Sequence, residues 1–250
     1  MSGPEAAGVR GVIFDLDGVI VDTEHLWGEA WADCARRHGA DWSHDDSTTV
    51  MGMSAPEWSA HLADHVGDAV TAGDVYSECV GSVVDAVRSG RGPLMRGARD
   101  LITDTAAVVP IALASSAARE VIDTVLEHEG IGHLFATTVS SEEVARGKPA
   151  PDVYAEAARR LGPQVVECGL AVEDSGNGIK AAKAAGLMVV VIPNPQFPPQ
   201  QDALDLADLV AADHDQARDY VLSRLEPQPD SRQDRIEARP DGTDRMRGAP

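Results

Sequence analysis

Apolar, mostly β-branched residues gather into short runs along the chain, and each run predicts a buried strand. The runs are Val9 to Phe14, Val109 to Ala114, Cys168 to Val172 and Leu187 to Ile192. The segments between the later runs have a helical period instead. "DVYAEAARRLG" stops at Gly162, and "GIKAAKAAG" stops at Gly186. Strands that alternate with helices predict a parallel α/β sheet covered on both faces.

The stretch 22–93 has a different character and predicts a small helical domain inserted into the α/β core. Two sets of residues there fall at helical spacing: Trp27, Ala30, Trp31, Cys34 and His38, and then Val80, Val83, Val84 and Val87. We therefore expect an α-helical cap at 22–93 above a core formed by 1–21 and 94–225. The tail 226–250 mixes Pro, Gly and both charge signs, which predicts disorder and no part in the chemistry.

Bulk properties narrow the class of protein and its partners. The longest apolar run, "LMVVVI", is far shorter than the roughly 20 residues that span a bilayer, and the N-terminus has no secretory pattern. We therefore expect a cytoplasmic protein without a membrane partner. The three cysteines lack a CxxC spacing, which argues against a disulfide framework and a zinc site. A net charge of -20 argues against nucleic acid as a partner.

Acidic side chains follow two of the predicted strands. Asp15 and Asp17 in "FDLDGVIVDTE" leave the first strand on the same side, and Gly18 allows a sharp turn. Glu173 and Asp174 end another strand in the same way. In a parallel sheet both pairs meet at one edge, where crowded carboxylates require a counter-charge. Oxygen ligands favour a hard divalent cation, and Mg²⁺ is the natural choice because it keeps positions for water and phosphate oxygens.

Further groups that suit a phosphate follow the other strands. Ser115 and Ser116 come after a third strand and are expected to open a helix, where a hydroxyl and free N–H groups bind an anion. Lys148 in "RGKPAPD" adds a cation. With the carboxylates and a dication, these groups predict a site for a phosphoryl group, with an oxygen of Asp15 attacking phosphorus.

Each of these residues also has a simpler interpretation. Ser115 can be only a helix cap and Lys148 only a solvated loop charge, while Glu173 and Asp174 can cap the helix that follows them. The remaining acids of the first motif, Asp22 and Glu24, are better explained as first-turn acids of the cap's leading helix. The order of the main set favours a site, because every group comes just after a predicted strand.

The motifs "FDLDGVIVDTE", "LASSA", "RGKPAPD" and "VEDSGNG", in this order and with an insertion after the first, resemble the haloacid dehalogenase-like hydrolase superfamily. The resemblance spans about 9–225 and is to the branch that holds β-phosphoglucomutase and small sugar-phosphate phosphatases. It implies a Rossmann-like core, a helical cap and a magnesium-dependent mechanism through an aspartyl-phosphate.

The resemblance also implies roles for individual residues. Asp15 would be the nucleophile, and Asp17 would protonate the leaving oxygen and then activate the hydrolytic water. Mg²⁺ would be held by the Asp15 carboxylate, the Asp17 backbone carbonyl and Asp174, with help from Glu173. The phosphoryl group would be bound by Ser115 and Lys148, with Ser116 beside it.

Within this family, the sequence favours a phosphatase acting on a small phosphomonoester, such as a sugar or polyol phosphate. The alternative is a β-phosphoglucomutase-type enzyme, which carries a histidine where this chain has Trp27 and an arginine where it has Ala55 and Pro56. Because the cap has no obvious cationic side chain to hold a second phosphate, hydrolysis is favoured. Trp27 itself can stack on a sugar or fill the cap core.

A non-catalytic phosphate-binding or phospho-acceptor module is an alternative of another class. Such modules are about half this length and lack both the cap and the second acid. The identity of the phosphomonoester and the oligomeric state are not determined by the sequence.

Overall fold

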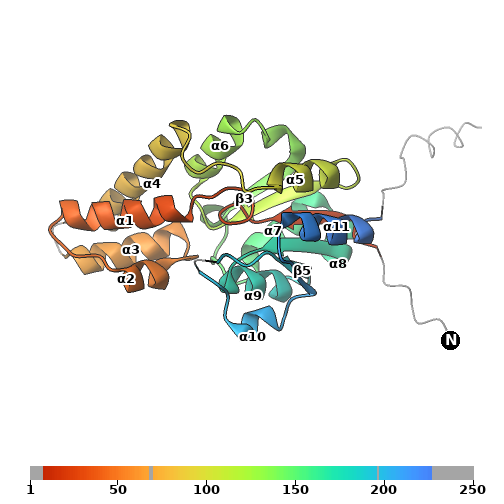
Figure 1. The fold of residues 1–250 in the computed structure, drawn as a ribbon. Coiled ribbons are helices and arrows are strands. Elements are labelled where there is room, and N and C mark those ends of the chain that lie inside the picture. The colour runs from red at the N-terminus through yellow and green to blue at the C-terminus, as the bar shows by residue number, and fades with distance from the viewer. Residues whose placement is uncertain (1–7, 68–69, 196, 227–250) are drawn as a thin grey trace, which may run out of the picture.

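The structure is a computed structural model that describes residues 8–67, 70–195 and 197–226, and within them six parallel strands form one sheet (Figure 1). The strand order is β3-β2-β1-β4-β5-β6. The strands are β1 (Gly11–Phe14), β2 (Ile111–Ser115), β3 (Phe135–Ser140), β4 (Gly169–Glu173), β5 (Met188–Val191) and β6 (Leu209–Val210). The four strands expected from the apolar runs are confirmed with ends shifted by a residue or two. The sequence did not predict β3 and β6.

The order of the strands reverses between β1 and β4, which lie side by side. Their register pairs Gly11 with Gly169 and Phe14 with Val172, so both strands end at the same edge of the sheet. In open α/β sheets of this order, ligands bind outside the carboxyl ends of the strands where the order reverses.

Helices cover both faces of the sheet, and successive strand residues divide between them. Val12 and Phe14 point into one apolar cluster, and Ile13 points into the other. The first face is covered by α5 (Ala98–Ala106), α6 (Arg119–His128) and α11 (His214–Arg224). The second is covered by α7 (Asp152–Leu161), α8 (Pro163–Cys168) and α9 (Gly176–Ala184), with α10 (Gln201–Leu204) against α9. Burial on both faces explains why the strands read as nearly continuous apolar runs.

The segment between β1 and α5 forms the helical cap, drawn in red to gold at one end of the molecule in Figure 1. Its helices are α1 (Glu24–Arg37), α2 (His44–Val50), α3 (Ala55–Val66) and α4 (Ala72–Arg88). Three indoles pack in its core, with ring centroids 5.6 Å apart for Trp27 and Trp58 and 6.0 Å apart for Trp27 and Trp31. The expected cap helices are therefore present, and His38 lies just beyond the end of α1.

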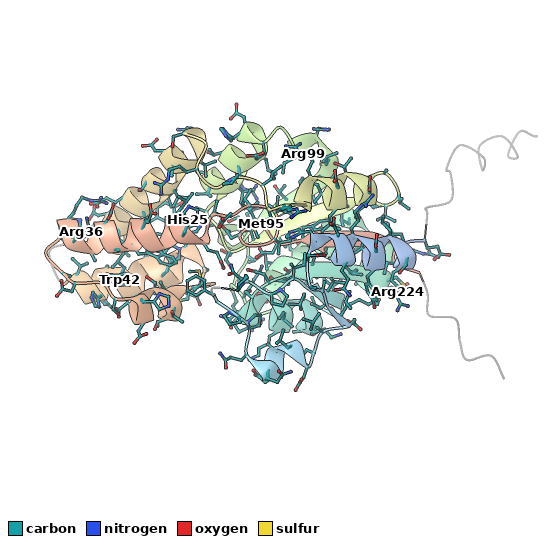
Figure 2. The ribbon with its side chains drawn as sticks, in the orientation of Figure 1. His25, Arg36, Trp42, Met95, Arg99 and Arg224 are labelled. Atoms are coloured by element: carbon teal, nitrogen blue, oxygen red, sulfur yellow. The ribbon has the colours of Figure 1, made fainter. Side chains whose placement is uncertain are left out.

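The cap joins the core through two chain segments that pair with each other. Val21 and Leu94 form an antiparallel bridge, and the Asp22 N–H donates to the Pro93 carbonyl at 2.9 Å. Met95 and His25 lie in this region in Figure 2, where the cap meets the core. The boundaries at 22 and 93 stay predictions.

Two remaining expectations concern the chain end and the membrane. Residues 227–250 of the predicted tail lie outside the described residues, whereas the Glu226 N–H donates to the Val9 carbonyl at 2.8 Å. Within the described ranges, every helix is too short or too polar to cross a bilayer.

Candidate active site

Asp15 is the first residue after β1 and lies buried at the edge where β1 and β4 end. Its N–H donates to the Val172 carbonyl at 3.0 Å, which fixes its backbone against β4. Its Oδ1 lies 2.9 Å from Lys148 Nζ. Burial raises the pKa of Asp15 to about 7, although the Lys148 charge acts in the opposite direction.

Asp17 lies two residues further on, and its carboxylate is held mainly by the cap. Its Oδ1 accepts hydrogen bonds from Thr23 Oγ1 at 2.5 Å and Trp27 Nε1 at 3.1 Å, and its Oδ2 lies 3.5 Å from Ser115 Oγ. Burial raises the pKa of Asp17, while the hydrogen bonds from Thr23 and Trp27 oppose that rise. The two aspartates therefore have different surroundings, an ammonium for one and neutral donors for the other.

The turn after Asp17 requires glycine for two separate reasons. Gly18 has φ 75°, and a Cβ built on it would lie 2.0 Å from Asp174 Oδ2. The bare backbone therefore lets the Asp174 carboxylate approach the β1 turn.

Asp15, Glu173 and Asp174 form the acidic cluster expected from the sequence. One oxygen from each lies within 4.8 Å of the others. Asp174 Oδ2 is buried and has no hydrogen-bond partner among the described residues, and burial raises the pKa of Asp174 well above its usual value. An all-oxygen donor set with an unpaired buried carboxylate oxygen fits a hard divalent cation.

Glu173 differs from its two neighbours because both its oxygens are already occupied. Oε1 accepts from Lys148 Nζ at 2.6 Å and Tyr154 Oη at 2.7 Å. Oε2 accepts from the N–H groups of Asp174 and Ser175 and from the Ser175 hydroxyl, each at 3.0 Å. Burial alone would raise the pKa of Glu173, but Lys148 and these hydrogen bonds bring it below its usual value.

Lys148 is buried between the acidic groups. Burial disfavours its charge, but Asp15 and Glu173 together raise the pKa of Lys148 above its usual value. The ammonium is therefore fixed beside Asp15, and it is not the solvated loop charge of the simpler interpretation.

The two predicted serines have different positions. Ser115 ends β2, is fully buried and accepts the Ala117 N–H at 3.0 Å, while Ser116 lines the pocket and donates to the Gly52 carbonyl of the cap at 3.3 Å. The expectation that they open a helix is wrong, since α6 begins only at Arg119. Ala118 has an extended ψ of 146°, so the backbone is not yet helical after the serines.

A pocket lies between these core residues and the cap. Its core side includes Asp15, Asp17, Ser116, Lys148 and Asp174, and its cap side includes Glu24, Trp27, Trp31, Met51, Met53 and Trp58. The predicted site residues Asp15, Asp17, Lys148 and Asp174 are therefore brought together with Ser116 at one pocket. Ser115 is fully buried beside Asp17 and does not line the pocket.

The first turn of α1 belongs to the site, which the sequence pattern does not predict. Glu24 is the first residue of α1, as expected, yet it is buried, lines the pocket and accepts a hydrogen bond from Asn194. Burial and the nearby Asp17 charge raise the pKa of Glu24 to about 8. Trp27 fills the cap core and also lines the pocket, so both interpretations of it hold in part. The only available signal was the spacing of Thr23, Glu24 and Trp27 on one helical turn.

This fold and site define a capped α/β hydrolase with a carboxylate cluster where the strand order reverses. Residues 9–186 match the haloacid dehalogenase-like hydrolase family, and the chain belongs to that family.

Relatives include a bifunctional riboflavin kinase/FMN phosphatase of Arabidopsis thaliana, 31% identical over 80% of this chain. The match covers 52% of that relative, so this chain spans about half its length. The fructose-1-phosphate phosphatase YqaB of Escherichia coli is 29% identical over 72% of this chain and 94% of that protein. The crystal structure of CbbY from Rhodobacter sphaeroides in complex with phosphate has a TM-score of 0.73 and 25% identity, covering 82% of this chain and 95% of CbbY.

Proposed function

We propose that the chain is a magnesium-dependent phosphatase that hydrolyses a small phosphomonoester, such as a sugar or polyol phosphate, through an aspartyl-phosphate on Asp15. The observation that carries the proposal is the position of Asp15. Its carboxylate is buried in a pocket, 2.9 Å from Lys148 Nζ and close to an unpaired oxygen of Asp174.

In the first step, an oxygen of Asp15 forms a bond to phosphorus as the ester P–O bond breaks. Asp17 gives its proton to the leaving oxygen, which departs as an alcohol. In the second step, Asp17 takes a proton from water, the water oxygen bonds to phosphorus and the Asp15–phosphorus bond breaks. Phosphate leaves, and both carboxyl groups return to their starting states.

The raised pKa of Asp17 supports its role as the acid. Burial favours the protonated form that the first step needs, and the cap residues Thr23 and Trp27 hold the group in place. Burial also raises the pKa of Asp15, but Lys148 Nζ lies 2.9 Å from its Oδ1 and favours its ionised form, which supports Asp15 as the nucleophile and Asp17 as the acid.

The cation would be held by the side chains of Asp15 and Asp174 and by the Asp17 backbone carbonyl. When bound, Mg²⁺ would stabilise the negative charge on the phosphoryl oxygens. The engaged oxygens of Glu173 support an indirect role, in which Glu173 orients Lys148 and the backbone of Asp174. Lys148 would bind the transferring phosphoryl group, and Ser116 would face it from the end of β2.

The cap side of the pocket favours a phosphatase over a mutase. Lys148 is the only lysine or arginine among the described residues that line the pocket. A mutase must hold a second phosphate, whereas this cap presents indoles and methionines. Trp31 lines the pocket, and its buried Nε1 has no hydrogen-bond partner among the described residues, so the cap keeps one unused donor beside the pocket.

The relatives support the same class of substrate. The Arabidopsis protein is named for FMN and the Escherichia coli protein for fructose 1-phosphate, and both are named as phosphatases. Polyol and sugar phosphates are therefore the first compounds to test.

The experiment is phosphate release from a panel of small phosphomonoesters with Mg²⁺, for the wild type and Asp15→Asn. We expect turnover of at least one sugar or polyol phosphate by the wild type and none by the variant. The panel includes β-glucose 1-phosphate with its bisphosphate activator. Formation of glucose 6-phosphate without phosphate release would favour the mutase, and lasting phosphorylation of Asp15 without turnover would favour the phospho-acceptor module.

A further inference from the structure

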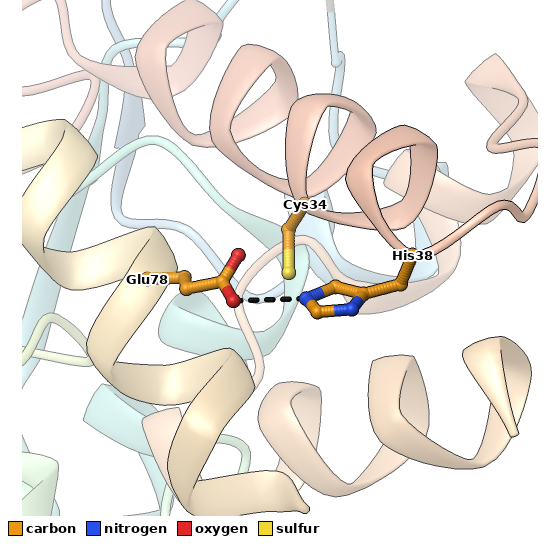
Figure 3. Close-up of side chains that lie close together, drawn as sticks. All are labelled: Cys34, His38 and Glu78. Atoms are coloured by element: carbon orange, nitrogen blue, oxygen red, sulfur yellow. Dashed lines mark hydrogen bonds and ion pairs between the residues drawn. The ribbon is translucent and has the colours of Figure 1, made fainter. Parts of the chain in front are cut away.

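A second cluster of metal-ligating side chains lies in the cap, away from the catalytic pocket. Cys34, His38 and Glu78 each offer one ligand atom, and these atoms lie within 4.8 Å of one another. Figure 3 shows Cys34 and His38 coming from the end of α1 and Glu78 coming from α4. Cys34 is fully buried, and the other two are half-buried.

Helix geometry explains how the cluster arises without a CxxC motif. Cys34 and His38 are four positions apart, so they share one face at the end of α1. That face packs on α4, which carries Glu78. The third ligand is far away in sequence, so cysteine spacing alone did not predict this group.

The hydrogen bonds around Glu78 hold the ligand atoms of the cluster in positions that suit a cation. His38 Nε2 lies 2.8 Å from Glu78 Oε1, and Arg37 binds only the other oxygen, with Nε and Nη2 at 3.1 and 3.0 Å from Oε2. A cation can therefore take the place of the His38–Glu78 hydrogen bond while Arg37 still orients the carboxylate. Ligating carboxylates are commonly held by an outer partner in this way.

We propose that Cys34, His38 and Glu78 bind a divalent transition-metal ion of the Zn²⁺ class, which ties α1 to α4. Sulfur, nitrogen and carboxylate donors together suit Zn²⁺ or Co²⁺, whereas Mg²⁺ prefers oxygen ligands alone. Three protein ligands leave a fourth position for water. The site is separate from the catalytic one, because Cys34 lies ten positions after Glu24, about 15 Å along α1.

The test is a titration of the full chain with Co²⁺, in excess Mg²⁺ that fills the oxygen-only catalytic site. We expect one equivalent of Co²⁺ to produce a thiolate-to-cobalt charge-transfer band that Zn²⁺ then removes. Cys34→Ser should abolish the band, and His38→Gln, at a half-buried position, should weaken Co²⁺ binding by more than about tenfold. The matched control is Cys168→Ser, which removes the half-buried thiol of α8 and should keep the band.

Asp174→Asn should also keep the band, because the catalytic carboxylates are not part of this site. Circular dichroism is measured on each variant to establish whether it is folded. Absence of a band in the wild type, its persistence in folded Cys34→Ser, or unchanged Co²⁺ affinity in His38→Gln would overturn the proposal.

Discussion

At the scale of single residues, the site gives different surroundings to two carboxylates that have only one residue between them. Asp15 faces a buried ammonium, and Asp17 faces hydroxyl and indole donors. Burial raises the pKa of both groups, to about 7 for Asp15. The ammonium opposes this rise at Asp15, and a bound dication would oppose it further, so the surroundings suit Asp15 to attack and Asp17 to carry a proton.

Replacement of Asp17 by Asn tests this division. The amide keeps the size of the carboxyl group but cannot transfer a proton, so we expect kcat to fall by about 10²- to 10⁴-fold. Mg²⁺ affinity should change little, because only the backbone carbonyl of this residue is proposed as a ligand. Steady-state phosphate release and Mg²⁺ titration calorimetry measure the two effects.

The matched control is Asp22→Asn, which removes an exposed carboxylate of the same motif. It should leave kcat near the wild-type value. If Asp17→Asn and Asp22→Asn released phosphate at similar rates, Asp17 would not be the acid.

The site residues that the sequence predicts are those that follow strand ends. The pairs after β1 and β4 had to meet because a parallel sheet places both ends at one edge, and Lys148 lies between them. The position of Glu24 in the pocket could not be predicted from the sequence, for a physical reason. Its place in the pocket depends on how α1 docks on the core, and no local pattern encodes that packing.

At the scale of elements, α1 serves both the cap core and the catalytic site. Trp27 packs against two other indoles and donates its Nε1–H to Asp17 at 3.1 Å. That hydrogen bond lowers the pKa of Asp17, which burial raises. The helix therefore lowers the pKa of Asp17 as well as covering the pocket.

Trp27→Phe separates these two tasks by keeping an aromatic ring and removing the donor. With the hydrogen bond gone, the pKa of Asp17 rises further, so the protonated acid persists to higher pH. We expect the basic limb of the kcat/KM profile to move to higher pH. A hydrogen bond to a charged group contributes about 1.5–3 kcal/mol, so kcat should also fall by roughly tenfold or more as Asp17 loses its positioning.

Trp31→Phe is the control, because Trp31 Nε1 has no hydrogen-bond partner among the described residues. It removes a ring of the same cluster and should leave the basic limb in place. An identical shift in both variants would assign the effect to packing and not to the hydrogen bond.

The β1 turn is a second element where the site depends on the backbone. Gly18→Ala would place a Cβ 2.0 Å from Asp174 Oδ2, and at φ 75° it also strains the chain. Gly90→Ala has a similar φ of 81° but meets nothing within 4 Å. We expect each variant to lose about 1–2 kcal/mol of unfolding free energy in urea. Only Gly18→Ala should also lose Mg²⁺ affinity, by tenfold or more, and equal Mg²⁺ affinities would contradict the close approach.

The two strands that the apolar runs do not predict, β3 and β6, are short or polar. β3 reads "FATTVS", with Thr137 and Thr138 half-buried at the edge of the sheet, so it lacks the continuous apolar run of a central strand. β6 has two residues, too few to give an apolar run, and it pairs with β5 at the other edge of the sheet. The strands that are buried on both faces are the ones that an apolar run identifies.

At the scale of the whole molecule, net charge opposes the proposed reaction. The chain carries -20, while a phosphomonoester is an anion, so the average field repels the substrate. Lys148, and the dication of the proposed mechanism, would reverse the field only at short range inside the pocket. Long-range repulsion and local attraction therefore act on different steps, the first on encounter and the second on the bound state.

Salt should distinguish these steps. Raising NaCl from about 10 mM to about 150 mM shortens the screening length from roughly 30 Å to about 8 Å, which weakens the repulsion at long range. Contacts inside the buried pocket are screened much less. We expect kcat/KM to rise a few-fold at fixed Mg²⁺ while kcat at saturating substrate stays nearly constant. A fall in kcat/KM with salt would mean instead that the cation and Lys148 attract the substrate before it reaches the cap.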